Sequence, residues 1–585
     1  AGYLAASVVL WWHVWSGDPA SVTTCGCGDA ARFVWFFEWP VYAIGHGHSL
    51  WYSTWLFHPT GINLLDDTSV LALGVLVAPV TAAFGPVAGM NVALTLAPAL
   101  SAMAAFALLR RWVRWWPAAV VGGALYGFSP FVVTELALNQ LNIAFLAVPP
   151  LIVLVLDELL VRQRRSATGA GLVLALLFAL EFFVSTEVLV IVGAFAVLGV
   201  ALLVVAVGMQ RPDVLRARFG HAAKGILVAL GTTAVLLAYP LWFLLRGPAH
   251  LSGRIWSNGT AFAEYGTTLS SFWRPGGLGS LRALSLRFGG YQGPVLPGLG
   301  YLGVGALVVA LLGLLAWHRD RRLVFFASLG LAAAGLSLAP GHGYFVPWQA
   351  LRHLPLVGNV VEARFTVVLV LCVAVMVALT LDHARASAPS GHGRRLVLLA
   401  LGALALVPTL VVLWPNVPLT TRTVELPPWF REVGSRLPPG EVLLVYPVPF
   451  SGLQSSQAWQ AVGGMRWAQA GGGGPTGQAD RAGRARPGFE VLLAASLALG
   501  RPPAPTPARI RAVREALAFW EVTMVVVPDQ GSLPPYERGR PTAYAVGLMS
   551  AAVGRSPARS HGAWVWSLRP GPLATVASAG SRPGP

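Results

Sequence analysis

A few charged residues stand beside long apolar stretches of this chain, where a charge is costly unless it has a role. Five of them are acidic and one is basic: Asp29, Glu38, Glu135, Glu181, Glu187 and Arg364. A carboxylate near an attacking hydroxyl can act as a general base, and the planar fork of an arginine can bind two oxygens of a phosphate. These residue types indicate group transfer from a phosphorylated substrate, provided that the fold brings them to one face.

Each of these residues also has a structural explanation. Glu135 and Arg364 can serve as interfacial anchors, and Glu181 can be a hydrogen-bonding group between two helices. Taken singly, the structural explanations are as good as the functional one. We favour the functional one because the orientation derived below puts the whole set at the outer face of a membrane.

Further polar residues lie between 46 and 63. His46, His48 and His58 can supply hydrogen bonds to a phosphate or a second acid or base, although H-G-H is also an ordinary polar turn. Asn63 follows in a Pro-Gly-Asn turn. We include all four among the candidate substrate-binding residues.

No motif assigns a metal or another cofactor. Asp66 and Asp67 resemble a pair of cation ligands, yet an acidic pair before a helix is more typical of an N-cap. Cys25 and Cys27 stand one residue apart with no second Cys pair nearby, which falls short of a metal site. These two cysteines are either free thiols or a strained disulfide, and a divalent cation is left open.

The elements that must position these residues are membrane helices. Only 11% of the 585 residues are charged, 55% are hydrophobic and the mean hydropathy is +0.64, whereas a soluble protein has about 25% charged residues. Apolar runs of about 20 residues can cross a bilayer. We predict an α-helical polytopic membrane protein with about eleven spans, near residues 1–15, 90–109, 117–134, 143–160, 168–185, 187–208, 225–245, 299–316, 323–339, 365–382 and 396–414.

Basic residues set the orientation of these spans. Arginine gathers in five connections, at 110–114, 162–165, 211–224, 319–322 and 385–395, whereas the connections 135–142 and 185–187 contain no basic residue. By the positive-inside rule the five connections face the cytoplasm. Residues 415–585 then lie outside the cytoplasmic membrane, with a large first loop at 16–89 and further loops at 246–298 and 340–364. Because the basic residues are spread over loops, nucleic acid is not expected as a partner.

The apolar run 69–86 is not counted as a span. It is shorter than the roughly 20 residues that a span needs, Pro79 breaks it, and Gly85-Pro86 ends it. Counting it would reverse the charge pattern. We predict a short juxtamembrane helix there, preceded by an aromatic-rich interfacial helix that begins directly after Asp29.

The residues after 414 differ in kind, so we divide the chain into a transmembrane domain (1–414) and an outer domain (415–585). Strand-like runs at 441–447, 522–528 and 563–568 surround a helical run at 508–520, which predicts a small α/β domain. We expect this domain to bind an acceptor glycan or a partner and not to carry the chemistry. Trp459 and Trp467 are candidate exposed residues for stacking on sugars, with core packing as the alternative.

The first loop resembles the GT-C superfamily of membrane glycosyltransferases, above all its actinobacterial cell-envelope members. It has an acid in Gly28-Asp29 just outside the first span, juxtamembrane helices, a Pro-Gly-Asn turn and a short helix that ends at Gly85-Pro86. The resemblance covers residues 1 to about 415 and the outer domain. Two features depart from it: a second G-D pair at Gly17-Asp18, and the lack of a D-x-D or E-x-D motif, which leaves metal use in doubt.

The resemblance implies a donor sugar carried on polyprenyl phosphate and a general-base role for Asp29 toward the acceptor hydroxyl. A membrane-borne donor also suits an outer site, since nucleotide sugars are cytoplasmic. Arg364 is our candidate phosphate anchor, because it begins a span with only Glu362 nearby and would need an anionic partner. The acceptor is a glycan, lipid or protein of the cell envelope.

Two other functions compete with this one. A transporter or flippase would use Glu181 and Glu187 as a proton or substrate path, although no internal repeat or pair of broken helices is visible. A scaffold of envelope assembly would keep the fold without the chemistry.

Overall fold

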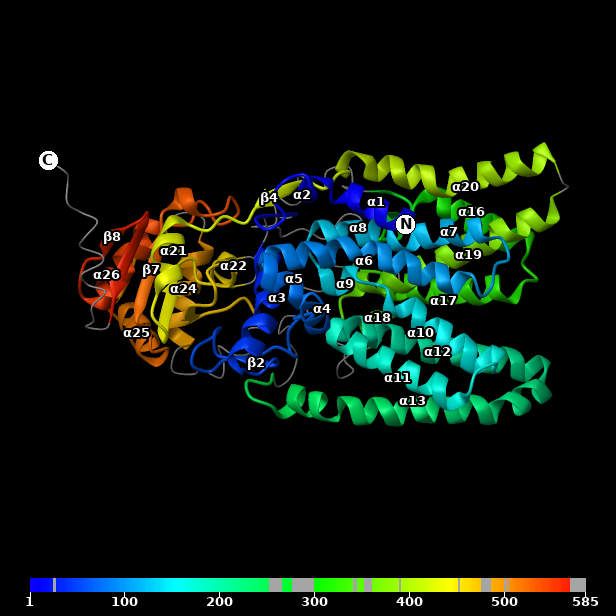
Figure 1. Ribbon diagram of the computed structural model, residues 1–585, viewed down its shortest axis with the longest axis horizontal. Coiled ribbons are helices and arrows are strands. Elements are labelled where there is room, and N and C mark those ends of the chain that lie inside the picture. Colours follow the sequence, from blue (N-terminus) through cyan, green and yellow to red (C-terminus); the bar gives the residue numbers. More distant parts are fainter. Residues whose placement is uncertain are drawn as a thin grey trace.

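The computed structural model describes residues 1–24, 28–251, 266–275, 299–339, 345–351, 360–388, 391–450, 453–474, 486–498, 502 and 504–568, with only the backbone of residues 28, 29 and 349. It is an elongated molecule in which a bundle of long helices joins an α/β domain at one end (Figure 1). Cys25 and Cys27 lie outside the described residues, whereas Cys372 is a buried free thiol.

The bundle consists of the helices expected from hydropathy. Its elements are α1 (Gly2–Leu10), α6 (Pro86–Leu109), α7 (Trp116–Gly127), α8 (Pro130–Ala137), α9 (Leu141–Ala144), α10 (Val148–Asp157), η1 (Glu158–Arg162), α11 (Ala167–Val184), α12 (Thr186–Gln210), α13 (Pro212–Arg246), α16 (Val304–Ala316), α17 (Arg321–Ser337), α19 (Thr366–Ser387) and α20 (His392–Leu413). Eight helical segments of the described chain are long and apolar enough to cross a membrane. The polytopic helical fold is confirmed, while α1, α16 and α17 fill the other three expected positions with only 9, 13 and 17 residues.

Two helices depart from the expected bounds for local reasons. The span expected at 117–134 is split into α7 and α8, because Ser129 caps α8 by accepting a hydrogen bond from the Val132 N–H and Pro130 occupies its first turn. Helix α13 begins at Pro212, well before the expected 225, and so includes much of a basic connection. Proline is favoured in the first turn of a helix.

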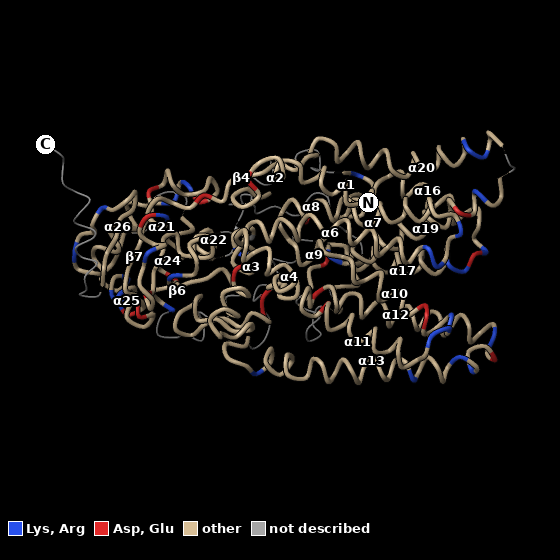
Figure 2. Tube along the Cα trace, viewed as in Figure 1, with Lys and Arg blue, Asp and Glu red and all other residues tan. Residues whose placement is uncertain are grey.

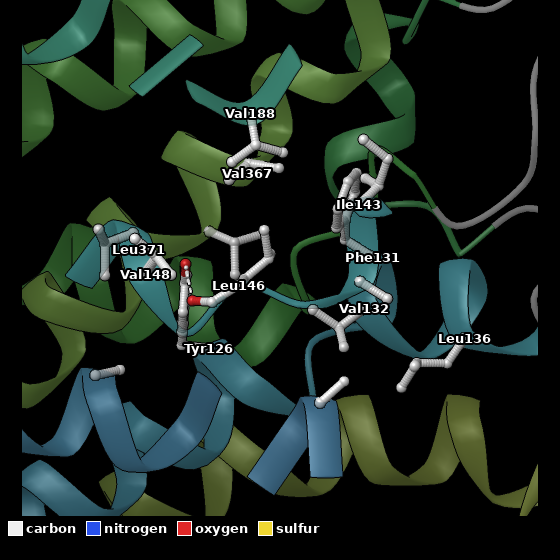
Figure 3. Packing of buried hydrophobic residues seen from close by; sticks show 14 of the residues in the cluster. Tyr126, Phe131, Val132, Leu136, Ile143, Leu146, Val148, Val188, Val367 and Leu371 are labelled. Atoms are coloured by element: carbon white, nitrogen blue, oxygen red, sulfur yellow. Dashed lines mark hydrogen bonds between the residues drawn. The ribbon is translucent and has the colours of Figure 1, made fainter. Parts of the chain in front are cut away.

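The interior of the bundle is packed with aliphatic and aromatic side chains from helices far apart in sequence (Figure 3). Val188 of α12 and Val367 and Leu371 of α19 meet residues from α7 to α10. The Tyr126 hydroxyl donates to the Leu146 carbonyl at 3.0 Å, so that this buried polar group is satisfied.

The first loop forms a layer between the bundle and the α/β domain. It contains α2 (Trp12–Trp15), β1 (Val22–Thr24), α3 (Gly28–His46), β2 (Tyr52–Ser53), β3 (Ile62–Asn63), α4 (Leu71–Leu76) and α5 (Ala78–Phe84). The run 69–86 therefore does not form a span, as predicted: α4 and α5 are short and separated at Val77, with Pro79 in the first turn of α5.

Helix α3 is the central element of this layer. It begins at Gly28, so that it includes Asp29 and does not begin directly after it as expected. It packs against α4, α5 and α6 on one side and against α22 (Ser455–Val462) of the α/β domain on the other. The expectation that its aromatic residues face the membrane interface is wrong. Phe33, Trp35 and Phe37 are fully buried, because two domains close over the helix, and the Trp35 indole N–H donates to the Gln460 side chain at 2.6 Å.

The α/β domain has a five-stranded mixed sheet in the order β6-β5-β7-β9-β8. Its strands are β5 (Glu441–Val445), β6 (Trp467–Gln469), β7 (Met524–Pro528), β8 (Ala558–Ser560) and β9 (Ala563–Ser567), and its helices are α21 (Pro428–Glu432), α22, α24 (Arg486–Leu497), α25 (Pro507–Phe519) and α26 (Thr542–Val553). The three predicted strands and the predicted helix are present as β5, β7, β9 and α25. Trp459 and Trp467 are 2% and 1% exposed, so the alternative of core packing is the correct one for both.

The Lys and Arg residues of the bundle gather at the end away from the α/β domain (Figure 2). This is the arrangement required by the predicted orientation, in which all five basic connections share one side. A strand pair, β1 with β4 (Thr421–Thr423), ties the first loop to the chain segment that leaves the bundle toward the α/β domain.

Candidate active site

Arg364 lies at the end of the bundle that adjoins the α/β domain. It belongs to η5 (Glu362–Phe365), directly before α19, and its guanidinium forms an ion pair with Glu187. The expectation that Arg364 has only Glu362 for a neighbour is therefore wrong. Its partner is 177 positions away in sequence and comes from the first turn of α12.

Glu187 is held in place by the chain on both sides. Ser185 caps α12 by accepting from the Val188 N–H at 3.2 Å, which fixes the first turn that carries Glu187. The other carboxylate oxygen of Glu187 accepts from the Val361 N–H at 2.8 Å. Both Glu187 and Arg364 keep part of their side chains exposed, at 15% and 21%, so a ligand can still approach the pair.

A second ion pair joins Arg32 of α3 to Asp67 at 3.2 Å. Arg32 also donates to the Gly473 carbonyl of the α/β domain at 3.1 Å and to the Thr68 hydroxyl at 3.3 Å. Asp67 accepts from the Thr68 N–H at 2.7 Å, and the Asp66 carboxylate accepts from the Leu251 N–H at 2.9 Å. Neither aspartate caps α4, whose N-cap is Val70, so the N-cap interpretation is wrong.

A cavity of about 30 Å³ separates the two ion pairs. This volume has room for about two water molecules. Its polar lining consists of Asp67, Thr68, Ser69, Asn142, Ser185, Thr186 and Glu187. The side-chain oxygen of Asn142 is buried without a hydrogen-bond partner in the described chain, which is a costly arrangement unless a ligand or water meets it.

Two of the predicted carboxylates are deeply buried in bundle helices. Glu181 of α11 is 0% exposed, and neither of its carboxylate oxygens has a hydrogen-bond partner among the described residues. Glu135 of α8 is 2% exposed. Neither residue lines the cavity. Of the predicted residues, the structure brings Glu187 and Arg364 into direct contact.

Asp29 and Glu38 both belong to α3. Asp29 lies in its first turn, three positions before Arg32, a spacing that puts two residues on the same face of a helix. Glu38 is partly buried one helical turn before Tyr42, and burial raises the pKa of its carboxyl from 4.5 to about 7. A carboxyl with such a pKa can exchange a proton near neutral pH.

The predicted histidines do not join the two ion pairs. His46 and His48 are exposed and stack with Tyr42, at ring-centroid distances of 4.1 and 5.8 Å. His58 contacts Glu521 of the α/β domain at 3.4 Å. Asn63 is fully buried and donates to the Phe243 carbonyl at 2.9 Å, so its contacts fasten the loop to α13.

Within the described chain, no group of three or more His, Cys, Asp or Glu side chains is arranged to hold a metal ion. Sequence reasoning missed Arg32 as a site residue. The one available signal was its position three residues after Asp29, because the Asp67 partner is remote and its pairing cannot be read from composition or periodicity.

No sequence family and no curated protein matches the chain. Solved structures do match. The arabinofuranosyltransferase AftD from Mycobacteria superimposes with a TM-score of 0.53 and 15% identity, covering 98% of this chain and 40% of AftD. The oligosaccharyltransferase from Archaeoglobus fulgidus has a TM-score of 0.50 and 14% identity, covering 95% of this chain and 70% of that protein.

These likenesses extend over nearly the whole chain, including the bundle, the first-loop layer and the α/β domain. This chain spans two fifths of the length of AftD. Both matched proteins are membrane glycosyltransferases of the GT-C superfamily, and the present multi-pass membrane protein has the GT-C fold.

Proposed function

We propose that this protein is a membrane glycosyltransferase that moves a sugar from a polyprenyl-phosphate donor to a glycan, lipid or protein acceptor of the cell envelope. The observation that carries the proposal is the cavity bordered by the Arg32–Asp67 and Arg364–Glu187 pairs within a GT-C fold. The cavity lining contains the acidic partners Asp67 and Glu187, and the Arg364 guanidinium stays partly exposed behind Glu187. Such an arginine is suited to a phosphate, because a guanidinium group makes charge-assisted hydrogen bonds to phosphate oxygens.

The proposed reaction is a single inverting displacement. The acceptor hydroxyl oxygen attacks the anomeric carbon of the donor, and the bond from that carbon to the phosphate oxygen breaks. The hydroxyl proton passes to Asp29, and polyprenyl phosphate leaves with the electron pair of the broken bond. Arg364 holds the phosphate before and after transfer, and a divalent cation is left open.

The reaction belongs on the outer side of the membrane in this proposal. Glu187 and Asp67 line one cavity together with residues of the first loop, and Arg32 also donates to Gly473 of the α/β domain. The basic connections lie at the other end of the bundle. If the basic end is cytoplasmic, the donor phosphate is presented at the outer surface, where the membrane itself delivers a lipid-linked sugar.

The test uses the purified full chain in detergent or nanodiscs with radiolabelled sugars on polyprenyl phosphate. Release of polyprenyl phosphate together with label on an envelope acceptor supports the proposal, and a chelator arm reports metal dependence. The control is Asp29→Asn, which keeps the shape of the side chain and removes its basicity. Equal donor consumption by the wild type and Asp29→Asn would overturn the role of Asp29.

One observation favours the transporter alternative. The Glu181 carboxyl is fully buried in a membrane helix without a hydrogen-bond partner in the described chain, as in some proton paths. Substrate flux into proteoliposomes that is lost in Glu181→Gln, with no sugar transfer by the wild type, would support that alternative against ours.

A further inference from the structure

A second cavity, of about 170 Å³, lies between the first-loop layer and the α/β domain. Its walls come from β1, the first turn of α3, the segment 422–425, α22 and the turn 534–536. The lining residues are Thr23, Ala30, Ala31, Arg422, Thr423, Val424, Glu425, Ser455, Ala458, Trp459, Pro534, Pro535 and Tyr536. Figure 1 shows α22 and β4 beside α3, where these segments meet.

This cavity has a buried floor and an open rim. Ala30, Ala31, Ala458 and Trp459 on the floor are all less than 8% exposed. At the rim, Thr423, Glu425 and Pro535 are exposed. A ligand can therefore enter past the rim. The cavity has room for about ten atoms of the size of a water oxygen, which is roughly the number of non-hydrogen atoms in one sugar ring.

Most polar side chains of the cavity carry hydroxyl groups, and fewer are charged. The Ser455 and Tyr536 hydroxyls are hydrogen-bonded to each other at 2.6 Å, and Thr423 adds a further hydroxyl. The Thr23 hydroxyl donates to the Asn91 side chain at 3.0 Å and can still accept a hydrogen bond. Hydroxyls can both donate and accept, as recognition of a polyol requires. Arg422 and Glu425 balance each other in charge, so the described lining is neutral and does not favour an anion such as a phosphate.

The floor supplies the apolar surface that a sugar ring also needs. Ala30, Ala31 and Ala458 give an apolar floor beside the buried Trp459 side chain, and Pro534 and Pro535 stand at the opening. Ligand sites typically combine such an apolar lining with a few placed polar groups. An aromatic, proline and hydroxyl lining without net charge fits a neutral carbohydrate better than a lipid phosphate.

The position of the cavity relates it to the proposed reaction. Ala30 lines it and follows Asp29 directly in the first turn of α3. Two residues after Ala30, Arg32 links α3 to Asp67 at the smaller cavity and to Gly473 of the α/β domain. The start of α3 thus lines the larger cavity and is tied to the smaller one through Asp67.

We propose that this cavity binds the terminal sugar of a carbohydrate acceptor, so that the acceptor is a glycan in place of a peptide or a lipid. This inference rests on the proposed function, because only a glycosyltransferase has an acceptor. It also explains why the α/β domain closes over α3: the two domains together form the walls of the acceptor site.

The experiment measures binding of fluorescently labelled arabinan and mannan tetrasaccharides to the full chain in nanodiscs, with a labelled tetrapeptide as comparator. Glu425→Trp obstructs the rim, and Ala458→Met fills the floor. Their matched controls are Glu432→Trp, at an exposed glutamate of α21 that does not line the cavity, and Ala461→Met, at a buried alanine of α22 that does not line it either.

At least tenfold weaker tetrasaccharide binding by Glu425→Trp and Ala458→Met, with wild-type binding by both controls, is the expected result. Equal binding by all five forms overturns the inference, as does binding of the tetrapeptide in place of both tetrasaccharides or no tetrasaccharide binding by the wild type. Because Glu425 is exposed, its substitution reports on binding even if Ala458→Met fails to fold. Donor consumption by the wild type is measured separately, so a failure of the proposed function is recognised independently of glycan binding.

Discussion

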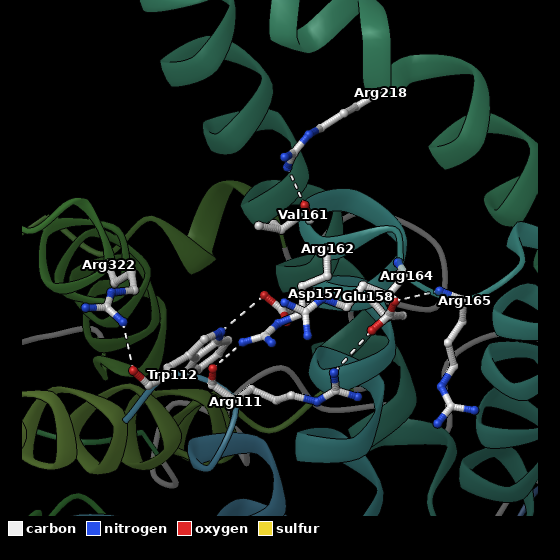
Figure 4. A network of polar contacts seen from close by, with 10 residues as sticks. All are labelled: Arg111, Trp112, Asp157, Glu158, Val161, Arg162, Arg164, Arg165, Arg218 and Arg322. Carbon is white, nitrogen blue, oxygen red and sulfur yellow. Dashed lines mark hydrogen bonds and ion pairs between the residues drawn. The ribbon is translucent and has the colours of Figure 1, made fainter. Parts of the chain in front are cut away.

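At the basic end of the bundle, ion pairs tie helix ends together, whereas at the opposite end two ion pairs border a cavity. The basic end is a connected network (Figure 4). Glu158 of η1 accepts from the N–H groups of Arg164 and Arg165 at 2.6 and 2.9 Å and pairs with Arg111 at 3.2 Å. Asp157 pairs with Arg162 at 2.8 Å and accepts from the Trp112 indole at 3.1 Å.

The two ends differ in the groups to which their charged side chains form hydrogen bonds. At the basic end, carboxylates meet backbone N–H groups and arginines meet carbonyls, so the network closes the ends of the helices. At the other end, Arg364 and Glu187 stay partly exposed beside a cavity that holds an unsatisfied Asn142 oxygen. Similar residue types therefore stabilise the fold in one region and leave binding capacity in the other.

The largest expected difference between the two ends of the molecule is that they lie on opposite sides of the membrane. We predict that Ser556, an exposed residue of the α/β domain, is outside and that Gln210, exposed at the basic end of α12, is inside. Single cysteines at these positions, in a chain with the native cysteines replaced, are treated with a membrane-impermeant maleimide on intact cells. Labelling at position 556 alone is expected, and labelling at position 210 alone would invert the orientation.

The largest expected change in rate comes from the start of α3. Asp29→Asn should lower turnover by roughly 10²–10⁴-fold with little change in donor binding, because a general base is removed and no phosphate contact is lost. The measurement is steady-state sugar transfer with a defined donor, with Asp18→Asn as the control from the second G-D pair. Near-wild-type turnover in a folded Asp29→Asn would move the search to Asp18 or Glu38.

The ion pair at the cavity should respond differently to loss of each partner. Arg364→Ala removes a charged contact to the phosphate, worth about 1.5–3 kcal/mol, so the Kd for the donor should rise by roughly 10–100-fold. Glu187→Gln removes the carboxylate that competes for the guanidinium and should not weaken donor binding. Equal weakening in both variants would mean that the pair is structural.

Hydropathy and charge were sufficient to predict the bundle. Apolar runs located its helices, and Pro79 and Gly85 marked the short helices at 69–86. Short runs rich in valine, leucine and tryptophan identified β5, β7 and β9. Each of these signals is local in the sequence. Short edge strands such as β6 and β8 were missed because three residues carry no usable periodicity.

Ion pairs between residues far apart in the sequence could not be predicted. The contact of Arg364 with Glu187 depends on how α12 and α19 pack, and that of Arg32 with Asp67 on the path of the first loop. For Trp459 and Trp467 the sequence allowed either stacking on sugars or core packing, and both side chains are buried in the α/β domain. Residue types therefore indicated the chemistry, while the partners required the fold.

The basic end should affect stability and not donor binding. Glu158→Gln weakens two charge-assisted hydrogen bonds and one ion pair of a buried carboxylate, so the free energy of unfolding should fall by about 1.5–3 kcal/mol. Thermal unfolding in detergent measures this loss. The control is Glu490→Gln in the exposed Arg486–Glu490 pair, where a change below about 0.5 kcal/mol is expected. A weaker donor Kd in folded Glu158→Gln would contradict the division between the two ends.

A pH dependence of the free energy of unfolding is expected from α3. Burial raises the pKa of the Glu38 carboxyl from 4.5 to about 7, so the folded state binds a proton that the unfolded state has lost between these values. The contribution of Glu38 to stability is then fully present below pH 4.5, falls as the pH rises toward 7, and stays low above it. Glu38→Gln does not titrate, so its stability relative to the wild type should increase from pH 4.5 to 7 and then level off. Thermal unfolding of both forms across this range measures the difference, and a constant difference would show that the Glu38 carboxylate is solvated in the folded protein.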